Sequence, residues 1–245
     1  MRSCFWFLLA CLLTGSALPS CGAIAYVQST KTAKGNAGNP TASFSSTPTV
    51  GDLVVASVAC YAAANCNVSS FSDNQSNTYT MVAKNIGYFS TQATVSLYYS
   101  IITTASGTFT VTANLTASED STLMIAEYSG IASASPVDIS TTATGSSTLA
   151  TATMTTTNAN DLLVDVVGVG GSAATPTAGS GFTMRQSNGS NSELMGLEDK
   201  TVSVAGSQTA TMNTPNSDWA SIVVAFQQAV AAPTILSRPR PIWIQ

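Results

Sequence analysis

Beyond the N-terminal segment, apolar residues occur in short runs rich in Val, Ile, Thr and Tyr, and Gly, Asn, Ser and Pro separate these runs. Such a pattern is typical of β-strands joined by tight turns. Ser- and Thr-rich tracts disfavour helix, because their hydroxyls compete for nearby backbone groups. The pattern predicts an all-β fold with two series of strands. The first lies near residues 24–29, 41–46, 52–60, 78–84, 94–102, 107–113 and 121–129, and the second near 137–141, 149–155, 161–169, 182–186, 193–200, 207–212 and 219–227.

The two series resemble each other in sequence. Segments 51–55, 79–81, 107–112 and 123–126 recur in the same order as 160–164, 182–184, 206–211 and 222–225. Ordered recurrence predicts an internal duplication, with repeats over residues 24–130 and 136–228.

Two arrangements satisfy a duplication. Both halves could contribute to one antiparallel two-sheet sandwich of jelly-roll type, or each could form one of two tandem Ig-like sandwiches. The connection over residues 129–136 is short for an interdomain linker, and residues 162–167 are apolar on both faces except at Asp165, as central strands of a large assembly are. We therefore expect one β-sandwich domain over residues 24–228.

The N-terminus predicts export. Arg2 precedes an apolar run over residues 4–13 that is too short to span a bilayer, so residues 1–23 read as a signal peptide. Residues 18–21 resemble a lipoprotein signal in which Cys21 would be lipidated, whereas Ala23-Ile24-Ala25 offers an ordinary cleavage site; both routes stay open. No other segment is long and apolar enough for a transmembrane helix.

The remaining cysteines and the C-terminus fit an exported chain. Cys60 and Cys66 bracket a short loop, so we expect a disulfide between them in an oxidising compartment. Residues 229–245 contain Pro233, Pro239 and Pro241, which exclude a central strand, so they are predicted to form a tail.

The composition narrows the classes of function. Only 8% of the 245 residues are charged, against about 25% in an ordinary soluble domain, and the formal net charge is −4. Eight basic residues argue against a nucleic-acid partner. The chain has no histidine, so His-activated nucleophiles and His-ligated metals are excluded. We expect no metal and no cofactor.

The segments 51–55, 72–79, 126–130 and 218–219 together resemble a group of exported bacterial β-sandwich surface domains that often accompany Ig-like modules. The resemblance covers roughly residues 24–228. It implies the fold and the compartment, and no settled activity. Related chains commonly carry Gly before Asn-Thr-Tyr, where this chain has Ser76.

Several acidic residues are candidates for chemistry. Asp52 and Asp161 precede equivalent strands, where a short carboxylate closes an Asx turn. Asp73 lies in an Asn-rich loop that could bind Ca²⁺, but it is the only local carboxylate, so a turn is favoured.

Glu127 shares a strand face with Leu123 and Ile125, and its expected counterpart in the second half is Phe226. A carboxyl group in such a core position could act as a general acid, or could fix the turn that follows it. A glycosidase would need a second carboxylate roughly 5–10 Å away. Asp165, Glu193 and Glu198 are available, and the spacing selects none of them.

The aromatic residues are distributed unevenly. All seven tyrosines lie in the first half, and exposed Tyr side chains can bind sugar rings. Tyr61, Tyr88 and Tyr98 are therefore candidate ligand-binding residues, although Tyr also simply suits strands. Tyr98 is expected to point away from Val95, Leu97 and the rest of their strand face, with Glu198 as its counterpart.

These observations lead to three hypotheses of function. The first is an exported, non-catalytic β-sandwich module for surface or extracellular binding, with a glycan or a cell-surface component as partner. The second is a purely structural envelope or spacer domain. The third is a carbohydrate-active hydrolase.

Overall fold

The computed structural model describes residues 22–35, 38–62, 66–88, 92–117, 120–171, 174–189 and 193–230. These residues form thirteen β-strands that pair in antiparallel ladders, which confirms the predicted all-β antiparallel sandwich. No helix of membrane-spanning length and apolarity occurs in the described part of the chain. The predicted signal peptide up to residue 21, with Cys21, and most of the predicted tail lie outside the described residues.

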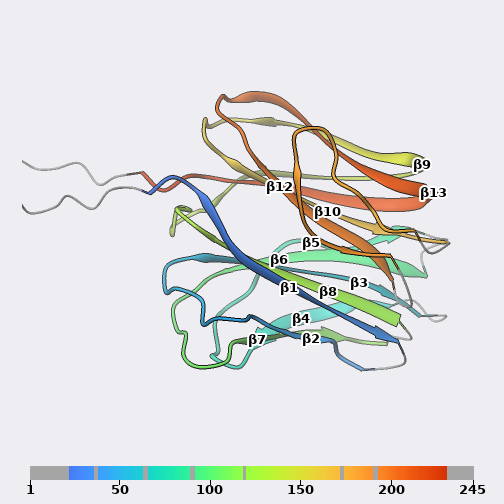
Figure 1. The fold of residues 1–245 in the computed structure, drawn as a ribbon, viewed down its shortest axis with the longest axis horizontal. Helices are drawn as coiled ribbons and strands as arrows, with labels where there is room; N and C mark the ends of the chain where they lie inside the picture. Colours follow the sequence, from blue (N-terminus) through green and yellow to red (C-terminus); the bar gives the residue numbers. More distant parts are fainter. Residues whose placement is uncertain are drawn as a thin grey trace, which may run out of the picture.

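The first half of the chain builds a five-stranded sheet and a three-stranded sheet (Figure 1). The five-stranded sheet has the order β1 (Ala25–Gly35), β8 (Asp120–Ser129), β3 (Leu53–Tyr61), β6 (Ala93–Ile101) and β5 (Thr80–Tyr88). The three-stranded sheet has the order β2 (Thr41–Ser43), β7 (Thr110–Leu115) and β4 (Val68–Asp73).

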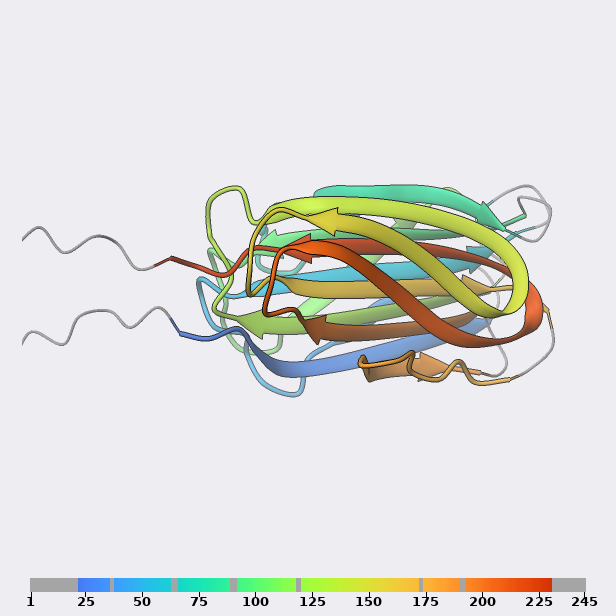
Figure 2. The same ribbon diagram turned by 90° about the horizontal axis from the view of Figure 1, so that it is seen from above.

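The second half builds another five-stranded sheet. Its order is β9 (Val137–Thr156), β13 (Gly206–Phe226), β10 (Leu162–Val169), β12 (Leu194–Thr201) and β11 (Thr183–Asn188). Strands β9 and β13 are long enough to leave this sheet as a two-stranded ribbon, in which residues 149–156 pair with 206–213. Figure 2 shows this ribbon twisting over the rest of the molecule.

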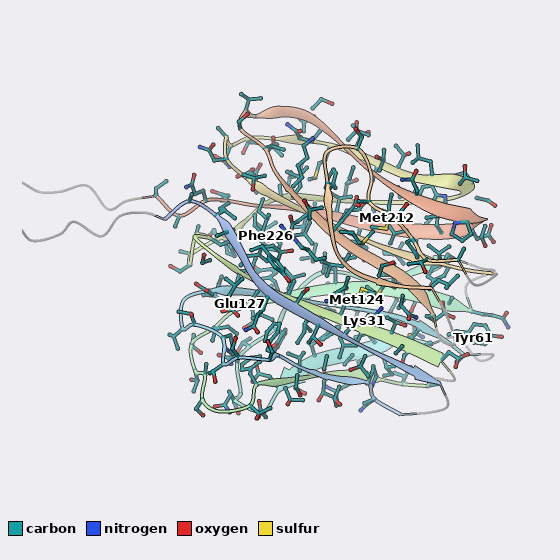
Figure 3. The ribbon with its side chains drawn as sticks, in the orientation of Figure 1. Lys31, Tyr61, Met124, Glu127, Met212 and Phe226 are labelled. Carbon is teal, nitrogen blue, oxygen red and sulfur yellow. A yellow bond between two sulfur atoms is a disulfide. The ribbon has the colours of Figure 1, made fainter. Side chains whose placement is uncertain are left out.

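The four layers are stacked in the order ribbon, second five-stranded sheet, first five-stranded sheet and three-stranded sheet (Figure 1). The largest core lies between the two five-stranded sheets, and Met124 and Phe226 are among its buried side chains (Figure 3). A second core fills the space under the three-stranded sheet, and two smaller ones lie under the ribbon. Each half keeps its own sheets, and the halves share one interior.

A polar network also joins the halves at one edge of this interior. The Tyr128 hydroxyl on β8 donates to Asp199 Oδ2 on β12 at 2.8 Å. Arg185 on β11 donates to the same carboxylate through Nε at 2.6 Å and Nη2 at 3.0 Å. The Arg185 guanidinium also lies over the Tyr26 ring of β1, 4.0 Å from its centre. Strands of both halves are thereby held in a fixed relation.

The strand orders of the two halves correspond. When β3 is matched with β10, β8 corresponds to the C-terminal part of β13 and β1 to the N-terminal part of β9. On the other side, β6 corresponds to β12 and β5 to β11. This agreement is what a duplication would produce, although the duplication itself stays a prediction.

Apart from shifts of a few residues at strand ends, such as β1 running to Gly35 and β5 to Tyr88, the strands differ from the predicted ones in three places. Strands expected at 137–141 and 149–155 are one strand, β9, and those expected at 207–212 and 219–227 are one strand, β13. Strand β4 was not predicted, because its two buried apolar residues, Val68 and Phe71, are three positions apart and a bulge between Val68 and Ser70 breaks the alternation of a strand.

The first and last described residues lie side by side at one end of the molecule (Figures 1 and 2). The side chain of Gln228 donates to the carbonyl of Gly22 at 3.3 Å, and the amide of Ala229 donates to the carbonyl of Gly130 at 2.8 Å. Tyr61 lies at the opposite end (Figure 3). Both outer layers are therefore left uncovered by the described termini.

Candidate functional site

The solvent face of the three-stranded sheet is a regular array of uncharged polar side chains. Thr112 of β7 lies between Thr41 of β2 and Ser72 of β4, and Ser43 lies opposite Thr110. Hydroxyl and amide groups of neighbouring strands are hydrogen-bonded to one another; Ser43 Oγ is 2.7 Å from Thr110 Oγ1. We call this array the sheet face, formed by Thr41, Ser43, Ser70, Ser72, Thr110, Thr112 and Asn114.

The ribbon carries a similar array on the opposite side of the molecule. Thr151 lies opposite Thr211, and Thr153 lies opposite Thr209 with their hydroxyl oxygens 3.1 Å apart. The alternate residues of the ribbon point inward and are buried, as Ala152 and the other members of its cores are. We call this array the ribbon face, formed by Thr151, Thr153, Thr155, Ser207, Thr209, Thr211 and Asn213.

Both faces have the same chemical character. Alternate residues along a strand are about 6.6 Å apart and neighbouring strands about 4.8 Å apart, so each face repeats hydroxyls on a grid. Hydroxyl and amide groups both donate and accept hydrogen bonds, and no charge has to be desolvated when they do so. These faces are suited to neutral ligands that carry many hydroxyls and offer nothing to a polyanion.

The three candidate tyrosines do not form an exposed surface. Tyr61 and Tyr88 both lie opposite Ala93, on the strands that flank β6, and both contact the core between the halves. Tyr88 is 4% exposed, and its hydroxyl donates to Glu193 at 2.8 Å. Its ring fits because residue 168 on β10 is Gly.

Tyr98 lies on the other face of the same sheet, as predicted, where it is 6% exposed. Its ring packs against Phe71 with a centroid distance of 4.8 Å. The premise that Tyr88 and Tyr98 are exposed to a ligand is therefore wrong: both rings fill apolar interiors on opposite faces of one sheet. Tyr61 alone is only partly buried.

Glu127 lies on the predicted face, and its carboxyl group is fully buried at the end of the molecule that holds the termini (Figure 3). It accepts hydrogen bonds from Gln28 Nε2 at 2.6 Å and from the Thr49 amide at 2.8 Å. Burial and a hydrogen bond with Glu127 raise the pKa of Asp52 to about 6. The second carboxylate near Glu127 is thus Asp52, and none of Asp165, Glu193 and Glu198 takes that place.

This arrangement corrects three expectations for Glu127. Its side chain fixes the loop before β3 instead of the turn that follows β8. Since Leu53 pairs with Tyr128 and Leu162 with Phe226, the counterpart of Glu127 is Ala225 and not Phe226. Two carboxyl groups in direct hydrogen-bonding contact also leave no room for the sugar that a glycosidase holds between them. The group is a structural clamp.

Asp161, the counterpart of Asp52, belongs to a similar pair at the start of β10. Burial and its neighbour Asp138 raise the pKa of Asp161 to about 7. Asp138 accepts hydrogen bonds from the amide and hydroxyl of Thr157, which lower its pKa in spite of partial desolvation. Both aspartates that were expected to close Asx turns are therefore held in carboxyl pairs, which the sequence pattern did not reveal.

A third acid pair lies under the ribbon. Asp165 and Glu198 are directly opposite each other on β10 and β12, and they are 1% and 0% exposed. Burial raises the pKa of Asp165 to about 7 and that of Glu198 to about 8. The equivalent positions in the first half are Ala56 and Tyr98, which belong to an apolar core. The acids are specific to the second half.

The loop around Asp73 is a closed turn. One carboxylate oxygen accepts the amides of Gln75 and Asn77, and the other accepts the Asn77 side chain at 3.1 Å. Ser76 has a φ of 64°, the left-handed conformation that Gly adopts more readily, so Ser takes a position in this turn that favours Gly. No group of three or more potential metal ligands occurs within the described residues.

The expected disulfide is present. The sulfur atoms of Cys60 and Cys66 are bonded, and this bond closes the loop that follows β3. Both residues are fully buried and form a small cluster with Ala62 and Leu115. A disulfide is consistent with an extracellular location.

Comparisons with known proteins do not add to this description: no family model, no curated protein and no solved structure matches the chain. The candidate site therefore depends on the geometry alone. Of its residues, sequence reasoning missed the two polar faces. A signal for one of them was present in the alternation of Thr over residues 149–155, where every second residue is Thr from 151 onward.

Proposed function

We propose that this chain is an exported, non-catalytic module that binds neutral, hydroxyl-rich surfaces, carbohydrate above all, through its two outer faces. The observation that carries this proposal is that hydroxyl and amide side chains in cross-strand register dominate the sheet face and the ribbon face, with the exposed Leu149 opposite Asn213 as an apolar residue at one end of the ribbon face. Ordered strands hold these groups in place, so binding costs little side-chain entropy.

The placement of the acids supports a non-catalytic role. Glu127 already accepts hydrogen bonds from Gln28 and Thr49, and the Asp165–Glu198 pair is buried under the ribbon. A hydrolase would need carboxyl groups that a substrate can approach. If the chain were a hydrolase, Glu127→Gln would abolish the release of reducing sugar from polysaccharides; we expect no release from either protein.

A structural role is the second candidate, and the shared interior of the halves favours it, since it makes the domain one rigid body. An in-line spacer would need chain ends at opposite ends of the domain. Here Gly22 and Gln228 are in contact, which favours a head that projects from its attachment.

The test is co-sedimentation with insoluble neutral polysaccharides such as cellulose and chitin, and titration of soluble glycans with and without calcium. Thr153→Lys and Thr209→Lys place charge on the ribbon face, and Thr112→Lys places it on the sheet face. Thr201→Lys, at an exposed strand end outside both faces, is the matched control.

We expect the wild type and the control to bind. A lysine on whichever face contacts the ligand should weaken binding at least tenfold. Absence of binding to every neutral glycan would remove the binding function and leave the structural role. Equal loss of binding in the control would show that the faces are not the site.

A further inference from the structure

The Asp165–Glu198 pair lies beneath a short loop, residues 174–181, which we call the cover loop. The Gly179 amide donates to Glu198 Oε2 at 2.9 Å. A Cβ atom at Gly196, two residues before Glu198, would lie 3.3 Å from Pro176 of the cover loop and 2.4 Å from the sulfur of Met212. The cover loop and the ribbon therefore close over this part of β12 together.

The cover loop is held by isolated hydrogen bonds to its neighbours and not by a strand ladder; on the β11 side, Ser187 Oγ donates to the Pro176 carbonyl at 2.7 Å. Thr177 and Asn213 form an isolated backbone bridge, and the Asn213 side chain donates to the Ala178 carbonyl at 2.9 Å. Gly179 lies so close to the Thr211 backbone that no side chain fits there. The loop takes the place that β4 has in the first half, with two bridge bonds instead of a strand ladder.

The acid pair has no cation to compensate it within the described residues. Asp165 Oδ1 accepts a hydrogen bond from Ser221 of β13 at 2.8 Å, and Glu198 Oε1 is buried with no hydrogen-bond partner in the part of the chain that the structure describes. On the same side of the sheet, β11 contributes Met184, and the ribbon contributes Met212. The side chain of Lys200, further along β12, lies over the Phe182 ring at 5.6 Å.

The charged groups on the other side of the sheet do not neutralise the pair either. The Arg185 guanidinium is occupied by Asp199. The negative charge of Asp199 adds to that of Asp165 in raising the pKa of Glu198, after the larger effect of burial. Two carboxyl groups that face each other in an apolar interior are stable only while they hold protons.

We propose that the Asp165–Glu198 pair is a proton-operated latch: the cover loop stays docked over β12 while the pair is protonated, and loss of the protons releases it. The unpartnered Oε1 of Glu198 explains why loss of protons releases the loop and does not tighten it. An ionised Glu198 needs hydrogen bonds from water at this oxygen, and the docked loop excludes water. The Gly179 hydrogen bond opposes release, since it becomes stronger when its acceptor is charged. Burial raises the pKa of Glu198 by more than this hydrogen bond lowers it, so the docked loop favours the protonated carboxyl group.

The pH range follows from linkage. The docked loop holds the pKa of Glu198 at about 8, and release of the loop would return this pKa toward the ordinary glutamate value of 4.5. Protons then bind more tightly to the docked form, so release becomes more favourable as the pH rises through this interval, by up to tenfold per pH unit. Above about pH 8 the effect of Glu198 is complete.

The experiment is amide hydrogen exchange by NMR, corrected for the intrinsic pH dependence of exchange. Protection of the Gly179 amide should fall at least tenfold between pH 6 and pH 8. The Ala113 amide, bonded to the Pro40 carbonyl at 3.1 Å in the first half, is the internal reference and should not change. In the variant Asp165→Asn/Glu198→Gln, protection of Gly179 should be independent of pH.

The latch is refuted if wild type and variant show the same pH dependence, or if Ala113 loses protection together with Gly179, since opening would then be global. Should the double variant not fold, titration of the Glu198 carboxyl carbon in the wild type decides: a midpoint below pH 5 overturns the latch.

The latch would also regulate the proposed binding. Thr177 pairs with Asn213, and the Ser180 amide donates to Thr211 Oγ1 at 3.3 Å, so the cover loop borders the ribbon face. This consequence rests on the proposed function: binding through the ribbon face should differ between pH 6 and pH 8, because the docked loop occupies Thr211 Oγ1 and the Asn213 side chain. Absence of binding at both pH values would refute the function and leave the latch, which hydrogen exchange tests separately.

Discussion

Substitution of Gly168 tests whether the two halves depend on one interior. An Ala Cβ on this β10 residue would lie 2.7 Å from Tyr88 Cε1 and 2.8 Å from its hydroxyl oxygen, both on a strand of the other half. The Tyr88 ring cannot easily move, because it is 4% exposed and its hydroxyl is bonded to Glu193. Gly168→Ala therefore overpacks the interface between the halves.

The expected cost follows from these contacts. Overpacking a dense core costs about 1–3 kcal/mol, and displacement of the Tyr88 hydroxyl adds about 1 kcal/mol for its hydrogen bond. Ala has a lower conformational entropy than Gly in the unfolded chain, and this difference offsets about 0.5–1 kcal/mol of the destabilisation. We expect Gly168→Ala to lower the free energy of unfolding by about 1–3 kcal/mol.

The assay is urea unfolding followed by circular dichroism and by fluorescence, in single and double variants. Tyr88→Leu removes the ring, so Gly168→Ala should cost less than about 0.5 kcal/mol in that background. Tyr88→Phe is the matched control, because the ring and its clash remain. Equal costs of Gly168→Ala in all backgrounds, or two separate unfolding transitions, would refute the shared interior.

Three further predictions concern the acids and the disulfide. Because burial raises the pKa of Asp165 from 3.8 to about 7, its contribution to stability is complete below pH 4 and is lost as the pH rises through 7. Urea unfolding should show a smaller loss of stability with pH in Asp165→Asn than in the wild type, by up to about 4 kcal/mol, and an unchanged pH dependence would contradict this. Glu127→Gln should lower the free energy of unfolding by about 1–3 kcal/mol, since one of its hydrogen-bond donors loses its acceptor; an unchanged urea midpoint would contradict the clamp. Reduction of the Cys60–Cys66 bridge should add two hydrogens by mass spectrometry and cost about 2 kcal/mol, because the closed loop is short; a mass that does not change on reduction would show that the thiols are free.

The regular part of the fold could be predicted from the sequence, because it follows from local patterns. The Asp-Leu pairs at residues 52–53 and 161–162 mark the starts of β3 and β10, and alternation placed Val95 and Leu97 on the face opposite to Tyr98. Cysteine spacing also gave the disulfide.

What depends on register or on distant contacts could not be predicted. The expected counterpart of Glu127, Phe226, is one residue away from the actual counterpart, Ala225. Similarity of apolar runs does not fix which residues pair across strands. Its contact with Asp52 joins residues 75 positions apart in the chain. The burial of Tyr88 requires Gly168 in the other half, and no local pattern around Tyr88 contains that information.

The arrangement of layers was also outside the reach of local patterns. The sequence suggested two sheets, whereas each half adds an outer layer to its five-stranded sheet: the three-stranded sheet in one half and the ribbon in the other. Strand β9 contains Gly145 and strand β13 contains Pro215, residues that normally mark turns, so the sequence predicted breaks there; the structure continues each strand from one layer to the next, with a register shift between Asn213 and Ser217.

The salt dependence of binding tests the central claim most directly, namely that uncharged outer faces recognise a neutral, hydroxyl-rich surface. The measurement is the binding isotherm of the wild-type domain on an insoluble neutral polysaccharide, repeated from low to high sodium chloride concentration. Binding through the sheet and ribbon faces predicts a dissociation constant that does not change with salt, because no ion pairs form. An affinity that falls steeply with salt, or binding restricted to charged polymers, would contradict the account.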